Sequence, residues 1–82
     1  MTGARTTFTL YSKPGCHLCE DVRAVLDELQ PARDYFIDEI DITADAALFA
    51  RYRFDIPVLL KNGVEVARGR IGERELVELI DG

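Results

Sequence analysis

Two cysteines separated by two residues are the part of this sequence best suited to chemistry. Cys16 and Cys19 are the only cysteines among its 82 residues. Within one turn of a helix they lie on the same face, at a separation that a disulfide spans without much strain. A disulfide that closes so short a loop stabilises a fold little, because the stabilisation grows with the length of the closed loop. The pair is therefore predicted to be redox-active rather than a structural staple.

Cys16 stands where a turn gives way to a helix. The turn residues Ser12-Lys13-Pro14-Gly15 precede it, so its sulfur is expected near the free N–H groups of the first helical turn. Those donors and the helix dipole stabilise a thiolate. The predicted reaction is an attack by Cys16 on a target disulfide, after which Cys19, less exposed because it is further into the helix, resolves the mixed disulfide.

Two other uses of the cysteine pair stay open. A tetrahedral metal site needs four ligands, and the chain offers two thiols and a single histidine, His17, so a metal or iron–sulfur site would have to span a dimer. A third possibility is a non-catalytic interaction domain in which the cysteines are dispensable. For a redox dithiol protein we expect no bound metal and no tightly bound cofactor.

Composition restricts the class of partner. The 15 acidic and 10 basic residues give a net charge of −5, which disfavours nucleic acid. No apolar run approaches the ~20 residues of a membrane span, and the first seven residues lack the apolar region of a secretory signal. We expect a cytoplasmic monomer with one domain over residues 1–82.

The first half of the chain predicts a strand, a helix and a second strand around the cysteines. β-branched and aromatic residues predict a strand over residues 6–11, and apolar residues at helical spacing predict a helix over residues 18–29. Pro31 is expected to stop this helix and to push Gln30 out of the helical region. Partial alternation of apolar side chains predicts the second strand over residues 34–42.

The second half predicts a short helix, a hairpin and a last helix. Thr43 is expected to cap the short helix, which runs from about residue 44 to residue 52. Strands over residues 56–60 and 64–67 are joined by Asn62-Gly63, a strong hairpin signal, and the last helix spans residues 73–80. Five aromatic residues fit core patterns: Phe8, Tyr35, Phe36, Phe49 and Phe54. The order β-α-β-α-β-β-α predicts an α/β fold with a four-stranded mixed sheet flanked by helices.

Residues 10–19, Leu-Tyr-Ser-Lys-Pro-Gly-Cys-His-Leu-Cys, resemble the active-site segment of glutaredoxins. The Cys-His-Leu-Cys version looks like the compact bacterial glutaredoxin-like proteins, and Ile56-Pro57-Val58 resembles that family's cis-proline loop facing the cysteines. The resemblance covers residues 6–81. It implies a thioredoxin-like fold of the glutaredoxin type and a dithiol–disulfide oxidoreductase of cell redox homeostasis, with Cys16 as nucleophile and Cys19 as resolving residue. It also implies that Pro57 shapes the groove for the substrate backbone.

Further candidate substrate-binding residues come from the loops around the pair. They are Lys13, His17, Ile56, Arg70 and Gly72. Lys13 matches a family position near the glutathione carboxylate. Arg68 or Arg70 would pair with an anion, unless these arginines are simply solvated surface. His17 either tunes the Cys16 thiolate or faces solvent as a neutral side chain.

The loop before the last helix bears on the choice of substrate. Glutaredoxins that use glutathione usually carry a Gly-Gly pair there, and this chain has Gly69-Arg70-Ile71-Gly72-Glu73 instead. Both glutathione, as a co-substrate, and a disulfide-containing protein therefore stay open as partners. A separate reductase is expected as the electron donor.

Overall fold

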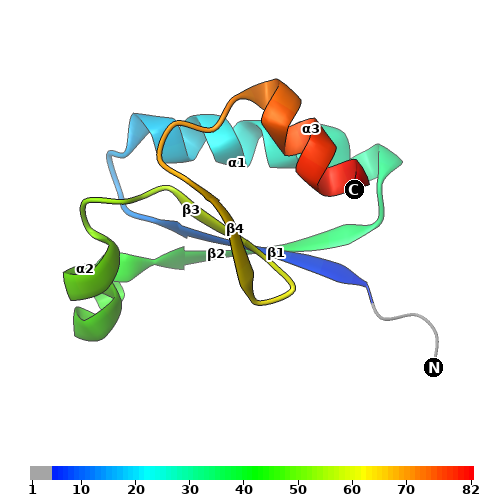
Figure 1. The fold of residues 1–82 in the computed structure, drawn as a ribbon. Coiled ribbons are helices and arrows are strands. Elements are labelled where there is room, and N and C mark those ends of the chain that lie inside the picture. Colours follow the sequence, from blue (N-terminus) through cyan, green and yellow to red (C-terminus); the bar gives the residue numbers. More distant parts are fainter. Residues whose placement is uncertain (1–4) are drawn as a thin grey trace.

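A four-stranded mixed sheet forms the centre of the computed structural model, which describes residues 5–82 (Figure 1). Strands β1 (Thr6–Ser12) and β2 (Tyr35–Asp41) pair in parallel and are connected by helix α1 (His17–Leu29). Strand β3 (Val58–Lys61) runs antiparallel to both β1 and β4 (Val64–Arg68), so the strand order is β2-β1-β3-β4. The predicted α/β architecture and its element order are confirmed.

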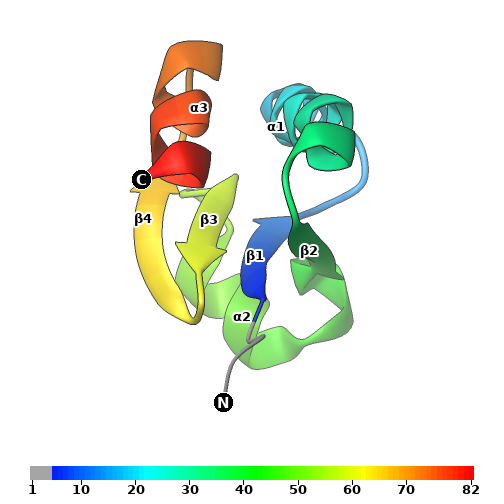
Figure 2. The ribbon, with the colours of Figure 1, turned by 90° about the vertical axis from the view of Figure 1, so that its right-hand side faces the viewer.

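The helices cover the two faces of the sheet unequally. Helices α1 and α3 (Glu73–Asp81) lie together over one face, and α2 (Ala46–Tyr52) covers only one end of the other face (Figures 1 and 2). The larger core lies under α1 and α3 and buries Phe8, Leu10, Val22, Leu26, Tyr35, Leu59 and Leu76. A smaller cluster, Ile42, Tyr52 and Val58, lies under α2. None of the helices within residues 5–82 has the length and apolar character needed to cross a membrane.

The hairpin between β3 and β4 forms as its Asn-Gly pair predicts. Asn62 and Gly63 have φ values of 52° and 84°, and a tight turn with two positive φ angles matches the twist of the flanking strands. The Asn62 side chain also accepts a hydrogen bond from the Thr7 N–H at 2.9 Å, which ties the turn to β1. The pairing contains one irregularity, between Leu59 and Leu60.

Helix α1 ends at Leu29 as predicted, but the predicted conformation of Gln30 and the predicted cap of α2 are wrong. Gln30 keeps helical angles (φ −59°, ψ −40°), and residues Gln30–Ala32 form a 3-10 turn in which Pro31 takes an early position that needs no N–H donor. The cap of α2 is Asp45 rather than Thr43. Its carboxylate accepts from the N–H groups of Ala47 and Leu48 at 2.9 and 3.1 Å, which satisfies two donors at the helix N-terminus.

Two of the aromatic residues predicted for the core are on the surface. Phe36 is 50% exposed and Phe54 is 86% exposed. Phe36 follows the buried Tyr35 in β2, and successive side chains of a strand point to opposite faces. Phe54 lies in the loop after α2, where the apolar periodicity of the helix no longer applies.

Candidate active site

Three segments meet at the end of the sheet where β1 leads into the cysteine pair. Because β3 is antiparallel to β1, the pairing of Val58 with Tyr11 places Pro57 beside the C-terminal end of β1. Val58 also pairs with Arg68, so the loop that follows β4 begins at the same end. The topology therefore brings the cysteines, the Ile56-Pro57 segment and the loop before α3 to one edge of the fold.

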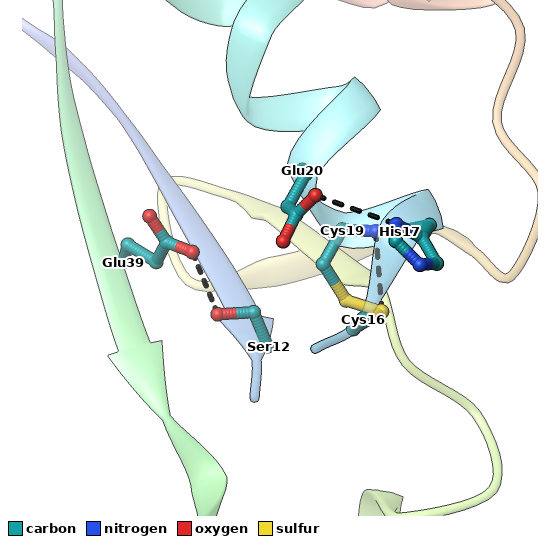
Figure 3. Close-up of a disulfide and its surroundings, with 6 residues drawn as sticks. All are labelled: Ser12, Cys16, His17, Cys19, Glu20 and Glu39. Atoms are coloured by element: carbon teal, nitrogen blue, oxygen red, sulfur yellow. Dashed lines mark hydrogen bonds and ion pairs between the residues drawn. A yellow bond between two sulfur atoms is a disulfide. The ribbon is translucent and has the colours of Figure 1, made fainter. Parts of the chain in front are cut away.

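Cys16 and Cys19 form a disulfide at the start of α1 (Figure 3). Cys16 is the N-cap residue, and its sulfur accepts a hydrogen bond from the Cys19 N–H at 3.2 Å. The turn before it is closed by the Cys16 N–H, which donates to the Lys13 carbonyl at 3.3 Å. Gly15 makes this turn with φ +81°, an angle that side-chain-bearing residues rarely adopt. The sulfur of Cys16 thus occupies the position where a helix N-terminus stabilises negative charge.

The two sulfur-bearing residues differ in access to solvent. Cys19 is 2% exposed, whereas Cys16 is only half-buried. A sulfur atom of a partner can approach Cys16 from solvent, but the packed chain covers Cys19. The predicted difference in exposure between the two cysteines is present in the structure.

His17 extends away from the protein surface. Its side chain is 92% exposed, and Nδ1 lies 3.6 Å from the Oε1 atom of Glu20 (Figure 3). This position fits the solvent-facing alternative, and an effect of His17 on the thiolate stays a prediction.

A polar cleft of about 390 Å³ lies on the β2 side of the cysteine pair. It is lined by Ser12, Lys13, Pro14, Glu20, Glu39 and Asp41. Ser12 is buried and donates its hydroxyl to the Glu39 carboxylate at 2.7 Å (Figure 3), while Arg23 donates to the other Glu39 oxygen at 3.0 Å. Hydrogen bonds from Thr43 lower the pKa of Asp41. Sequence reasoning missed Ser12 and Glu39, because their contact depends on the register of β1 and β2.

The Ile56–Pro57 peptide bond is cis, and Pro57 is buried. The Gly69 N–H, which belongs to the loop after β4, donates to the carbonyls of Pro57 and Asp55 at 2.7 and 3.2 Å. Gly69 adopts φ +74°, which favours glycine at this position. Ile56 packs its side chain into the cluster under α2, so it supports the Pro57 segment from within.

Arg68 ties the same two loops together through its side chain. Its guanidinium lies 3.1 Å from the Asp55 carboxylate and donates to both oxygens of Glu65 at 2.6 and 2.8 Å. These pairings raise the pKa of Arg68, and the hydrogen bonds from Arg68 lower the pKa of Glu65. We call Asp55, Glu65, Arg68 and Gly69 the loop clamp. Because its donors already serve two carboxylates, Arg68 is the poorer of the two arginines predicted to pair with an anion.

Arg70 and Gly72 are exposed on the loop that leads from the clamp to α3. Gly72 is also the N-cap of α3, and its carbonyl accepts the first hydrogen bond of that helix, from the Leu76 N–H at 3.0 Å. Across residues 5–82, no three side chains of His, Cys, Asp or Glu are grouped so that they could hold a metal ion. A metal or cluster at Cys16 and Cys19 would need ligands from another molecule.

Comparison with known proteins places the chain in a family. The model of the Glutaredoxin-like domain (DUF836) matches residues 7–81. The chain belongs to this glutaredoxin-like family. The family predicted from the Cys-His-Leu-Cys segment is thereby confirmed.

Solved structures agree with this assignment. The structural-genomics target XcR50 from X. campestris is 31% identical over 90% of this chain and 95% of its own, with a TM-score of 0.71. Protein Ne2328 from Nitrosomonas europaea is 23% identical over 98% and 96% of the two chains, with a TM-score of 0.76. A mutant thioredoxin from Halobacterium salinarum is 23% identical over 93% of this chain and 72% of its own, with a TM-score of 0.71. These similarities confirm the thioredoxin-like fold, and together with the cysteine pair they are consistent with redox activity.

Proposed function

We propose that this glutaredoxin-like protein is a dithiol–disulfide oxidoreductase. The observation that carries the proposal is the disulfide at the N-terminus of α1, with one accessible cysteine and one buried cysteine. In a structural disulfide no such difference in access is required. In a thiol exchange catalyst it decides which sulfur meets the substrate first.

The reaction begins with the reduced protein. The Cys16 thiolate attacks one sulfur of a target disulfide, a Cys16–target bond forms, and the target's own S–S bond breaks to release a thiolate that takes a proton from solvent. Cys19 then loses its proton and attacks the Cys16 sulfur. The Cys16–Cys19 disulfide forms, and the second target sulfur leaves as a thiol. The target gains two electrons, which the cysteine pair loses, and an external thiol reductant restores the pair.

The environment of Cys16 favours its role as the attacking group. In the disulfide form its sulfur accepts a hydrogen bond from the Cys19 N–H at 3.2 Å. We expect the same donor and the helix dipole to stabilise the Cys16 thiolate of the reduced protein. The fixed Ile56-Pro57 segment supports a groove for the substrate backbone, and Lys13, Arg70 and Gly72 are exposed around the same edge of the fold. We assign the Ile56-Pro57 segment, Lys13, Arg70 and Gly72 to substrate binding.

The partner that we propose is a disulfide-containing protein or glutathione, with a separate reductase as electron donor and no tightly bound cofactor. We place this activity in a monomeric, cytoplasmic protein. Absence of the Gly-Gly pair before α3 makes the protein disulfide the better supported of the two substrates.

A turnover assay tests the proposal. The protein is supplied with a model disulfide and either glutathione with glutathione reductase or thioredoxin reductase, and NADPH consumption is followed. We expect turnover with at least one donor and none for Cys16→Ser. Iron content and visible absorbance after anaerobic purification are measured on the same sample. A coloured, iron-loaded protein without turnover would favour the cluster-binding alternative. A colourless protein without turnover would favour a non-catalytic interaction domain.

A further inference from the structure

An exposed aromatic side chain, Phe54, lies on the segment that leads into Pro57. Phe54 is 86% exposed, the most exposed of the large apolar residues described within residues 5–82. It precedes Pro57 by three residues on the segment that leads into β3. Since Val58 pairs with Tyr11 at the end of β1, this segment lies at the edge of the sheet that carries Cys16.

The backbone around Phe54 is fixed on both sides. The N–H groups of Asp55 and Ile56 both donate to the Tyr52 carbonyl, at 2.8 and 3.2 Å. The side chain and carbonyl of Asp55 are held by the loop clamp. A ring presented on a fixed backbone loses little conformational freedom when a partner binds, which is a property of aromatic anchors in protein interfaces.

Phe54 has a charged residue on each side in the sequence, Arg53 and Asp55, and of these Asp55 is already paired with the Arg68 guanidinium. The Arg53 guanidinium carbon lies 4.6 Å from the centroid of the Phe54 ring. Arg53 and Arg51 are exposed, and so is Arg70 on the neighbouring loop. The strand order β2-β1-β3-β4 puts this flank on the β3 side of the cysteines, opposite the cleft that contains Glu20, Glu39 and Asp41.

We propose that Phe54 and Arg53 form a docking surface for a protein substrate whose segment near the reacting disulfide carries an apolar side chain beside an Asp or Glu. The apolar side chain packs on the Phe54 ring, and the carboxylate pairs with the Arg53 guanidinium. Charge complementarity selects an acidic segment over a basic one on this flank. The inference rests on the proposed oxidoreductase function and names the substrate class for the same site.

The protein itself offers a matched control. Phe36 is also an exposed phenylalanine with a guanidinium over its ring, that of Arg5 at 4.6 Å. It pairs with Thr7 near the start of β1, at the opposite end of the sheet from the cysteines. Phe36→Ala therefore removes the same kind of side chain without touching the proposed docking surface.

The test compares second-order rate constants for oxidation of the fully reduced protein by three disulfides. These are 2-hydroxyethyl disulfide and two disulfide-linked peptide dimers, one with Leu-Glu and one with Leu-Lys beside the cysteine. We expect the wild type to prefer the Leu-Glu peptide. Phe54→Ala should slow that peptide about fivefold or more, with less than about a twofold change for 2-hydroxyethyl disulfide, and Phe36→Ala should change neither. Arg53→Gln should reduce the preference for Leu-Glu over Leu-Lys.

Several results would overturn the docking surface. Equal rates for Phe54→Ala and wild type on the Leu-Glu peptide, equal losses for Phe54→Ala and Phe36→Ala, or a wild-type preference for Leu-Lys would each do so while leaving the oxidoreductase intact. An equal loss on all three disulfides would show that Phe54 only supports the cysteine site. A wild-type protein that reacts with none of the three would remove the oxidoreductase and the docking surface together.

Discussion

Cys16 has a chemical environment that Cys19 lacks, because it precedes α1 whereas Cys19 lies inside the first turn. The Cys16 sulfur accepts a hydrogen bond from a backbone N–H group, and Cys16 is partly exposed to solvent, whereas Cys19 is buried. Both residues and their spacing could be identified from the sequence, since a helix N-terminus is predicted from local residue types.

The pKa of the Cys16 thiol is the first prediction. In a Cys19→Ser background, we expect Cys16 to be alkylated as a thiolate with a midpoint well below the ~8.5 of an unperturbed thiol. The pH dependence of iodoacetamide labelling, followed by mass spectrometry, measures this midpoint. Cys19 in a Cys16→Ser background is the control, and it should not show the lowered midpoint. A Cys16 midpoint at or above ~8.5 would contradict an activated nucleophile.

The cap of α2 shows where residue types alone are insufficient. Thr43 and Asp45 both belong to the residue types that cap helices. The choice depends on the preceding segment, which forms a separate 3-10 turn over Ile42–Ala44 whose own cap is Asp41. That turn displaces the start of α2 to Ala46, and no local pattern distinguishes it from the first turn of the helix.

At the level of elements, the hairpin, the helices and the strand order follow from periodicity and turn chemistry. The contacts between loops do not, because they join residues that are distant in sequence. Gly69 is an example: it contacts Asp55 and Pro57 only because β3 and β4 pair. The positive φ of Gly69 gives this contact a testable consequence.

Gly69→Ala should lower stability and also slow the reaction with a disulfide substrate. The left-handed conformation costs a residue with a Cβ about 1–2 kcal/mol, and adjustment of the backbone would weaken the hydrogen bond to the Pro57 carbonyl. Nothing lies within 4 Å of the added Cβ, so the effect comes from the backbone. Denaturant unfolding and the rate of disulfide reduction are the two measurements.

Gly63→Ala is the control for this variant. Gly63 has a similar φ of +84° and open space around its Cβ position, but it lies in the hairpin turn, away from the Pro57 segment. It should lower stability by a similar amount and leave the rate unchanged. Equal losses of rate in both variants would argue that Gly69 acts through stability alone.

At the scale of the whole molecule, ion pairs join segments far apart in the sequence. Arg33 binds both carboxylate oxygens of Asp81 at 2.7 and 3.2 Å, which attaches the C-terminal helix to the loop before β2. The loop clamp does the same for the two loops beside the cysteines. The charges are evident in the sequence, but their pairing and the polar cleft require the register of the sheet.

Stability should fall in acid. The pKa of Asp81 is lowered by its hydrogen bonds with Arg33, that of Glu65 by Arg68, and that of Asp41 by Thr43. A carboxyl whose pKa is lower in the folded state contributes stability that is complete above its unfolded pKa, near 4, and is lost as the pH falls through its folded value. Urea unfolding between about pH 6 and pH 2 should show this loss below about pH 4. Arg33→Gln should make the free energy of unfolding depend less on pH. A stability that stays constant or rises in acid would contradict a role of these carboxylates in stabilising the fold.

Covalent trapping shows which cysteine attacks the substrate and which one resolves the mixed disulfide. Each single variant, Cys16→Ser and Cys19→Ser, is incubated in the reduced form with a disulfide-containing protein and analysed by non-reducing mass spectrometry. We expect a stable mixed disulfide through Cys16 in the Cys19→Ser variant and none in the Cys16→Ser variant. A mixed disulfide that forms through Cys19 instead, or fails to form in both variants, would contradict this expectation.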